Sequence, residues 1–596
     1  MKILKTFQIR IQGLTNAVTR FPITTIFLLV ATITNAVHIT SETDDYPNML
    51  LTFIVGAFLA TTLQVTYERY AHKLSYRILT IVASLLLAIG YYFITLPAQK
   101  LGVVILIRTF IGLFSLFLAF IWIPVIRSRH NFNENFMAVF KALFSALFFF
   151  GIIFAGISII LATTNQLLFD ISGKSYLHSL NIIFTLFCPI YFLSLIPIFP
   201  GNLDTHKSEE ELTRQEEIVS NAIHCPKFLE ILVSYIIVPL ISIFTLILII
   251  YLLRNISGDF WTNNLLEPMI ISYSITVIIL YILVSELDNR FAHYFRKICP
   301  KVLVPIVIFQ VIATFLNLDS TGITHKRYFV LIYGIFSIIA GILLCFLPVR
   351  KNGIIAAIII VFSVISITPP VDAFTISRAS QLAILEHTLN KNHMLEKNLL
   401  TPSASLSYED KERIITTTRY LYDIEYTEHL NWLPKNFNYY DSFEKTFGFN
   451  SYDGSNNIQQ PVYLSLKQQT PIDITGYDNF IYSNVYIAGA EMETKLCDFH
   501  KSGQNFSLIR ITTKNQCTLK LVDSNNKELI RFNTMEIFDQ FKDNNVIKEQ
   551  LSADQATFSK DSDFAKMTLI LQNLNIEYNS KNPVYSADLY ILINIK

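Results

Sequence analysis

The residues that could perform chemistry are few and scattered along the chain. The clearest cluster is acidic, with Glu42, Asp44 and Asp45 in one short hydrophilic stretch. In a multispan membrane protein this stretch would be the first loop on the outer side. Multispan transferases that use lipid-linked donors also carry acidic residues in that loop. The stretch is too short for the helices that such enzymes place there, so a solvated loop is the simpler interpretation.

Arg108 is the one ionisable residue well inside a long apolar segment. It lies roughly 10 Å from the nearer end at helical rise, a depth from which its side chain can largely reach back to water. Snorkelling or a structural ion pair is the favoured interpretation, and a substrate or ion role is the alternative. No carboxylate stands convincingly at mid-membrane, which weakens the case for an ion-coupled carrier.

Familiar catalytic patterns are missing from the sequence. It has no G-x-x-x-x-G-K, no G-x-S-x-G, no H-E-x-x-H and no C-x-x-C, and its 12 histidines do not cluster at ligand spacing. We therefore expect no catalytic residues, no metal site and no cofactor.

Two of the six cysteines, Cys497 and Cys517, lie in the C-terminal part of the chain. In an oxidising compartment they could form a disulfide that closes a loop worth roughly 3 kcal/mol. Two independent buried thiols are the alternative, since spacing alone does not bring the α-carbons within bonding range.

Composition divides the 596 residues into two parts near residue 371. Residues 1–371 carry 25 Lys/Arg and 18 Asp/Glu, whereas the shorter remainder carries 22 and 28. The first part is poor enough in charge to be a membrane domain, and the second has an ordinary soluble composition. Neither part has the basic excess that nucleic-acid binding requires, so nucleic acid is excluded as a partner.

Eleven segments of the first part are long and apolar enough to cross a bilayer as helices. The predicted spans are Phe21–Ile39, Asn48–Tyr67, Ile78–Leu96, Leu101–Val125, Phe140–Thr164, Leu180–Phe199, Leu229–Leu253, Leu265–Ser285, Val302–Leu318, Tyr328–Leu347 and Gly353–Thr368. With a cytoplasmic N-terminus, the inside connections hold 18 Lys/Arg and the outside connections hold five. Positive connections stay in the cytoplasm, so an odd number of spans predicts that the tail, residues 372–596, is exported.

The tail is predicted to be α+β. Apolar residues at helical spacing predict a juxtamembrane helix over Ile376–Leu389, and Ser407 with Asp410 opens a second helix that ends near Tyr426. From about Val462 the apolar period changes to two, which predicts strands in a mainly antiparallel sheet. The expected strands are Phe506–Ile511, Cys517–Val522, Glu528–Phe532, Met567–Tyr578 and Val584–Ile595. The expected domains are therefore a transmembrane domain (1–371), a juxtamembrane helical segment (372–460) and an exported β-rich domain (461–596).

Several short motifs occur in a fixed order along the chain. They are GITHKRY at Gly322–Tyr328, SRASQL at Ser377–Leu382, KERII at Lys411–Ile415, Tyr420-Leu421 and ITGYD at Ile474–Asp478. In this order they resemble a large bacterial family of polytopic membrane proteins that is catalogued as a domain of unknown function. The likeness runs from Phe21-Pro22 to the end, although Asn479 stands where an aromatic residue is expected. The resemblance implies architecture and a bacterial cytoplasmic (inner) membrane, and it supplies no activity.

Topology suggests roles for these motifs. Gly322–Tyr328 and the segment with Ser380 and Gln381 both emerge on the predicted outer face, so we expect them to dock the tail on the membrane domain, with Arg327 giving charge-assisted hydrogen bonds. For Gly476-Tyr477-Asp478, a turn is favoured over a ligand site.

Three functional classes remain open. The favoured one is a non-enzymatic envelope sensor, binding or scaffold protein; the alternatives are a permease and a membrane glycosyl or lipid-group transferase. The bilayer is the one partner implied directly, and an envelope protein or a glycan is a possible further partner.

Overall fold

The computed structural model describes residues 12–41, 47–71, 73–96, 101–200, 209–255, 267–318, 322–451, 462–487, 492–513, 516–541, 549–578 and 583–596. The chain divides into two compact units. The bundle unit contains Met1–Leu400 and Thr416–Tyr439, and the sandwich unit contains Thr401–Ile415 and Tyr440–Lys596.

The described part of the bundle unit holds 11 helical segments that are long and apolar enough to cross a membrane, which confirms the predicted spans. They are α2 (Pro22–Ser41), α3 (Pro47–Tyr70), α4 (Leu74–Thr95), α5 (Val103–Trp122), α6 (Phe132–Leu167), α7 to α8 (Lys174–Ser194), α10 to α11 (Lys227–Asn255), α12 (Glu267–Val284), α13 (Arg290–Leu316), α15 (His325–Phe346) and α16 (Gly353–Ile367). Helix α9 (Glu209–Ile223) precedes the seventh span and is rich in glutamate.

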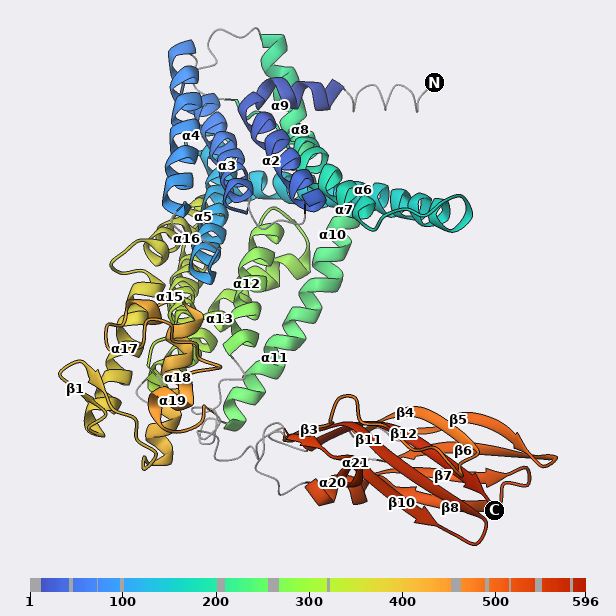
Figure 1. Cartoon of the computed structure of the whole chain (residues 1–596). Helices are drawn as coiled ribbons and strands as arrows, with labels where there is room; N and C mark the ends of the chain where they lie inside the picture. Colours follow the sequence, from blue (N-terminus) through green and yellow to red (C-terminus); the bar gives the residue numbers. More distant parts are fainter. Residues whose placement is uncertain are drawn as a thin grey trace. The chain divides into compact units, whose positions relative to one another are not determined.

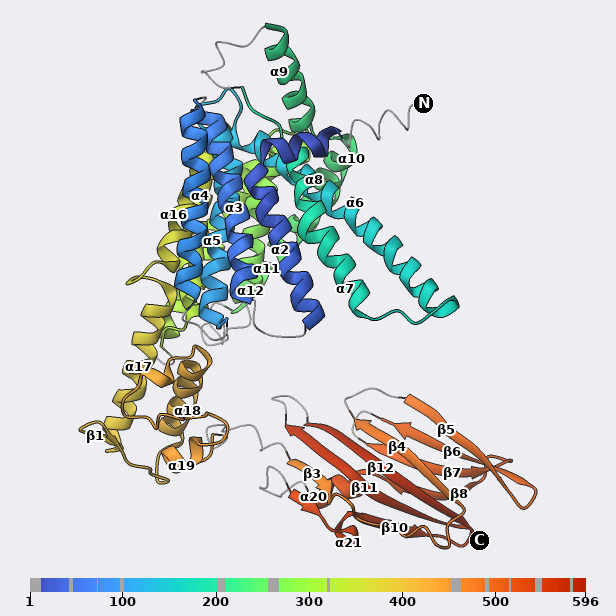
Figure 2. The same cartoon turned by 45° about the horizontal axis from the view of Figure 1, so that its top comes forward.

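The spans differ in how much of each helix is buried. Tyr273 and Val277 of α12 are buried among the neighbouring spans, whereas Leu86 and Ile94 of α4 are exposed. Exposed leucine and isoleucine on a spanning helix face hydrocarbon in a bilayer, so they carry no penalty there. Helices α2, α3, α4 and α5 run side by side at one edge of the bundle (Figures 1 and 2), and α12, α13, α15 and α16 pack next to one another.

After the last span, the bundle unit continues into helix α17 (Ala373–Lys391), which confirms the expected juxtamembrane helix. The side chain of Asp372 caps α17 by accepting a hydrogen bond from the amide of Phe374. A short hairpin follows, with β1 (Leu395–Glu396) paired to β2 (Leu399–Leu400). Helix α18 (Tyr408–Asp423) has Ser407 as its cap, as the sequence predicts, and contributes residues to both units.

The sandwich unit contains two sheets that share one hydrophobic core. The first has the order β4 (Asn479–Ile487), β12 (Pro583–Ile595), β11 (Ala565–Tyr578), β3 (Val462–Leu466), β9 (Glu549–Leu551), with β10 (Thr557–Asp561) also on β11. The second has the order β5 (Met492–Lys501), β6 (Gln504–Thr512), β7 (Cys517–Asp523), β8 (Glu528–Asn533). Only β3 and β9 pair in parallel among the described strands. All five predicted strands are present, and the mainly antiparallel architecture is confirmed.

Candidate functional site

Two of the sequence motifs meet where α17 packs on the bundle. The Ser380 hydroxyl accepts a hydrogen bond from the Ile323 amide at 3.0 Å, and the Gln381 amide donates to the Ile323 carbonyl at 3.3 Å. Gly322 has a φ of +69°, and a Cβ there would lie 2.3 Å from Ile384 of α17. Glycine is needed because the backbone is left-handed and α17 passes directly over it.

Arg327 does not bond to α17. Its guanidinium donates to the carbonyls of Asn317 and Gly322, at 3.4 and 3.3 Å, and therefore braces the connection in which it lies. The Tyr328 hydroxyl donates to the Val371 carbonyl at 2.5 Å, which ties the start of α15 to the residue just before the tail. Docking of the tail on the membrane domain remains a prediction for the sandwich unit.

Arg108 forms an ion pair with Asp372, at 2.5 Å. The Asp372 side chain is fully buried, whereas a third of the Arg108 side chain is exposed. Burial raises the pKa of the Asp372 carboxyl, but hydrogen bonds from Thr375 and Arg108, together with the charge of Arg108, outweigh it and hold the pKa below its ordinary value. This ion pair supports the structural interpretation of Arg108, with Asp372 as its partner.

Three aromatic rings complete this contact. His325 at the start of α15 stacks on Phe374 of α17 and on Tyr420 of α18, with ring centroids 5.2 and 5.6 Å apart. The Tyr420 hydroxyl accepts a hydrogen bond from the His325 amide and donates one to Ser377. Burial raises the pKa of Tyr420, so the phenol is neutral and able to donate. We call Arg108, His325, Asp372, Phe374 and Tyr420 the α17 junction.

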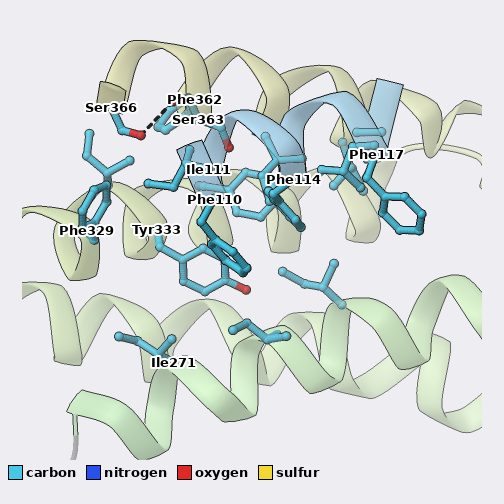
Figure 3. A pocket seen from close by; sticks show the side chains of 18 of the residues that line it. Phe110, Ile111, Phe114, Phe117, Ile271, Phe329, Tyr333, Phe362, Ser363 and Ser366 are labelled. Carbon is cyan, nitrogen blue, oxygen red and sulfur yellow. Dashed lines mark hydrogen bonds between the residues drawn. The ribbon is translucent and has the colours of Figure 1, made fainter. Parts of the chain in front are cut away.

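A large apolar pocket runs along the spans (Figure 3). His325 of the α17 junction is one of the residues that line it. Its volume is about 800 Å³, and its walls come from α5, α12, α15 and α16, with Phe132 and Phe136 of α6 also lining it. Phe110, Phe114 and Phe117 of α5 line one side, and Ile275 and Ile279 of α12 line another.

The pocket is open to the surroundings of the bundle. Among its lining residues, Phe110 is 73% exposed, and Ile275 and Ile279 are 40% and 39% exposed. Since these residues lie within membrane spans, the opening faces hydrocarbon. A lipid chain could therefore enter from the bilayer without crossing water.

Polar groups in the pocket are concentrated toward one end. His325 and Lys326 begin α15, and Ser363 and Ser366 lie near the end of α16, where the Ser366 hydroxyl donates to the Ser363 carbonyl. His325 and Lys326 are the only ionisable side chains other than Tyr333 among the described lining residues. No carboxylate lines the described part of this pocket. Its described walls therefore provide no Asp or Glu side chain that could act as a general acid or bind a cation.

The Gly476-Tyr477-Asp478 motif forms a turn that fastens the end of the chain. Gly476 has a φ of +80°, and the Asp478 carboxylate accepts hydrogen bonds from the Ile595 amide and from Lys501, both at 2.8 Å. Desolvation raises the pKa of Asp478, but the hydrogen bonds from Lys501 and the Ile595 amide, together with the charge of Lys501, outweigh it and hold the pKa below its ordinary value. The Tyr477 hydroxyl shares a hydrogen bond with Thr568. Each of these contacts supports a structural role.

The strand register excludes the candidate disulfide. Both Cys497 and Cys517 are free, on β5 and β7, with β6 between them. Cys497 pairs with Leu508 and Cys517 with Thr512, four residues further along β6. At normal strand spacings their α-carbons lie about 17 Å apart, well beyond the roughly 7 Å that a disulfide tolerates. The alternative of two independent thiols fits, and burial raises the pKa of each.

The acidic cluster Glu42, Asp44 and Asp45 lies outside the described residues. Within the described ranges, no group of three or more His, Cys, Asp or Glu side chains is placed to hold a metal ion.

Sequence reasoning missed Asp372 and the pocket, and although His325 and Tyr420 lie in the motifs singled out above, it did not predict that they contact each other. Asp372 could have been noticed as the first ionisable residue after the last span, close to a buried arginine in need of a partner. Phe110, Phe114 and Phe117 recur at helical spacing, but that pattern is shared by every helix that faces lipid. The pocket depends on how four helices pack, which periodicity does not encode.

The comparisons give a family and no activity. No curated protein and no solved structure matches the chain significantly. The family model described as Domain of unknown function (DUF4153) matches residues 23–404, which covers the spans and continues past α17. This chain is therefore a multispan membrane protein that belongs to the DUF4153 family.

Proposed function

We propose that this protein is a non-enzymatic binding protein of a bacterial cytoplasmic membrane, and that its bundle binds the hydrocarbon chain of a membrane lipid. The observation that carries the proposal is the apolar pocket between α5, α12, α15 and α16. At about 800 Å³ it is within the range of sites that bury small ligands, and its lining suits a chain rather than a polar solute.

The tail is proposed to be exported. Most Lys/Arg residues of the connections lie on the same side of the membrane as the N-terminus, which supports a cytoplasmic N-terminus. With an odd number of spans, the tail then lies on the opposite side. In this orientation the α17 junction lies at the outer surface, where a bound lipid could affect how α17 is held. A sensor or a scaffold could use such a link, because the junction joins the pocket wall to the tail through His325.

The permease and transferase classes have less support. A polar solute needs polar walls at mid-membrane, and a transferase needs a reactive acid or base beside the bound chain. The pocket walls are almost entirely aliphatic and aromatic.

Retention of lipid through detergent purification tests the proposal. Ile279→Trp adds an indole ring to the pocket wall and narrows the pocket, whereas Ile243→Trp, on the exposed face of α11, makes the same change outside it. Mass spectrometry should find lipid bound to the unmodified protein and to Ile243→Trp, and at least tenfold less bound to Ile279→Trp. Equal retention by all three, at similar thermal stability, would refute the proposal.

A further inference from the structure

The pocket is long enough to hold one acyl chain, and it extends from the first turn of α15 to Phe132 and Ile355, which begin α6 and α16 near the opposite ends of the spans. Its lining residues run from Ile107 to Leu118 on α5, from Ile271 to Ile282 on α12 and from His325 to Phe336 on α15. Each interval corresponds to about 16 Å of helix, or roughly half of a 30 Å hydrocarbon core. The pocket begins at the first turn of α15, which is where a lipid headgroup would lie if the chain occupied the pocket.

The charges at that end leave one cation without a partner. Arg108 and Asp372 neutralise each other across 2.5 Å. Arg327 and Glu267 interact electrostatically, with Glu267 also accepting a hydrogen bond from Thr314. Lys326 is exposed, lines the pocket and has no hydrogen bond or ion pair with any residue that the structure describes. Lys326 is therefore the one lysine or arginine among the described residues that line the pocket.

Lys326 suits a ligand at the membrane surface. It lies on the first turn of α15, and the N-terminal end of a helix also favours an anion. A lysine near a bilayer surface attracts anionic lipid by about 1 kcal/mol. A polar solute is not favoured, because apart from Tyr333, Ser363 and Ser366 the lining below Lys326 is aliphatic and aromatic.

We infer that the pocket selects an anionic phospholipid, with one acyl chain between α5 and α12 and the headgroup charge at Lys326. This inference rests on the proposed function, since it assigns the headgroup of the lipid whose chain the pocket holds. Binding of the headgroup at Lys326 requires no rearrangement of the bundle, because Lys326 is exposed at the end of the pocket where α15 begins. The preference should be modest, since a single exposed lysine supplies it.

Native mass spectrometry from defined bilayers tests the inference. The protein is reconstituted in equal amounts of phosphatidylglycerol and phosphatidylcholine with identical acyl chains, then released and scored for retained lipid. The unmodified protein should retain phosphatidylglycerol over phosphatidylcholine by roughly fivefold, the ratio that 1 kcal/mol gives. Lys326→Gln should retain as much lipid in total with a ratio near one. The matched control is Arg254→Gln, which removes an exposed cation on the same predicted side, at the end of α11 and outside the pocket. It should keep the fivefold ratio.

The outcomes separate the two claims. Retained lipid with no headgroup preference in the unmodified protein would overturn the anionic assignment and leave the proposed function standing. A preference that survives in Lys326→Gln, or one that Arg254→Gln removes equally, would also overturn the assignment to Lys326. If the unmodified protein retains no lipid, the proposed function itself fails.

Discussion

At the scale of single residues, the α17 junction shows how an arginine within a span is accommodated. Arg108 lies on a membrane helix, and its partner Asp372 caps the helix that follows the last span. The pair therefore satisfies a charge near the bilayer surface and fixes the start of α17 at the same time. Removing one partner from such a pair costs more than the pair itself contributes, because the other charge is left buried and unpaired.

Asp372→Asn should lower the free energy of unfolding of the purified protein by roughly 2 to 3 kcal/mol. This value is below that of a fully buried pair because Arg108 is partly exposed to solvent. The matched control is Glu216→Gln, since Glu216 pairs with Arg129 on the surface and both side chains are largely exposed. That change should cost less than about 0.5 kcal/mol. Thermal unfolding in detergent measures both, and equal small losses would contradict the role given to Asp372.

The same carboxylate should make stability depend on pH in a defined window. The pKa of Asp372 is lower in the folded protein than in the unfolded chain, so its contribution is complete above the unfolded value of about 3.9. It is lost as the pH falls through the lower folded pKa. The stability difference between the unmodified protein and Asp372→Asn should therefore be constant from pH 5 to 7 and shrink below about pH 4. A difference that shrinks near neutral pH would point to another group.

At the scale of elements, the close approach of α17 to the connection before α15 depends on Gly322. Gly322→Ala adds a Cβ against Ile384 and forces an L-residue into a left-handed conformation, so it should cost about 1 to 2 kcal/mol and expose α17 to protease. Gly112→Ala, in the middle of α5 with open space around it, is the matched control. It should be neutral or slightly stabilising, because alanine is the better helix former. Limited proteolysis and thermal unfolding of both variants test this contact, and equal behaviour would contradict it.

Most elements could be predicted from the sequence because each follows from a local pattern. The spans follow from runs of apolar residues such as Leu265–Ser285, and β11 and β12 follow from a largely alternating pattern of apolar and polar residues. The sequence left open whether Cys497 and Cys517 form a disulfide, because the answer depends on register between strands, which places β6 between the two cysteines. The partner of Arg108 was missed for a similar reason, since it lies 264 residues away in the chain. Local patterns specify elements, and the site arises from contacts between them.

At the scale of the whole molecule, sidedness determines what the pocket and the tail can meet. The lysine and arginine distribution predicts that residues 372–596 are outside the cytoplasm. Alkaline phosphatase fused after Lys596 should therefore be active in bacterial cells, and green fluorescent protein at the same position should be dark. A bright green fluorescent fusion would reverse the topology and would place the Lys326 end of the pocket on the cytoplasmic side.

The central claim is that the pocket between α5, α12, α15 and α16 is occupied by a lipid chain in a membrane. Cryo-electron microscopy of the protein in nanodiscs of native lipid measures this directly. We expect an elongated density along Phe114 and Ile279 that ends beside Lys326, and we expect this density to be lost in Ile279→Trp. A pocket closed by its own side chains, or one that contains only separate water densities, would contradict the account.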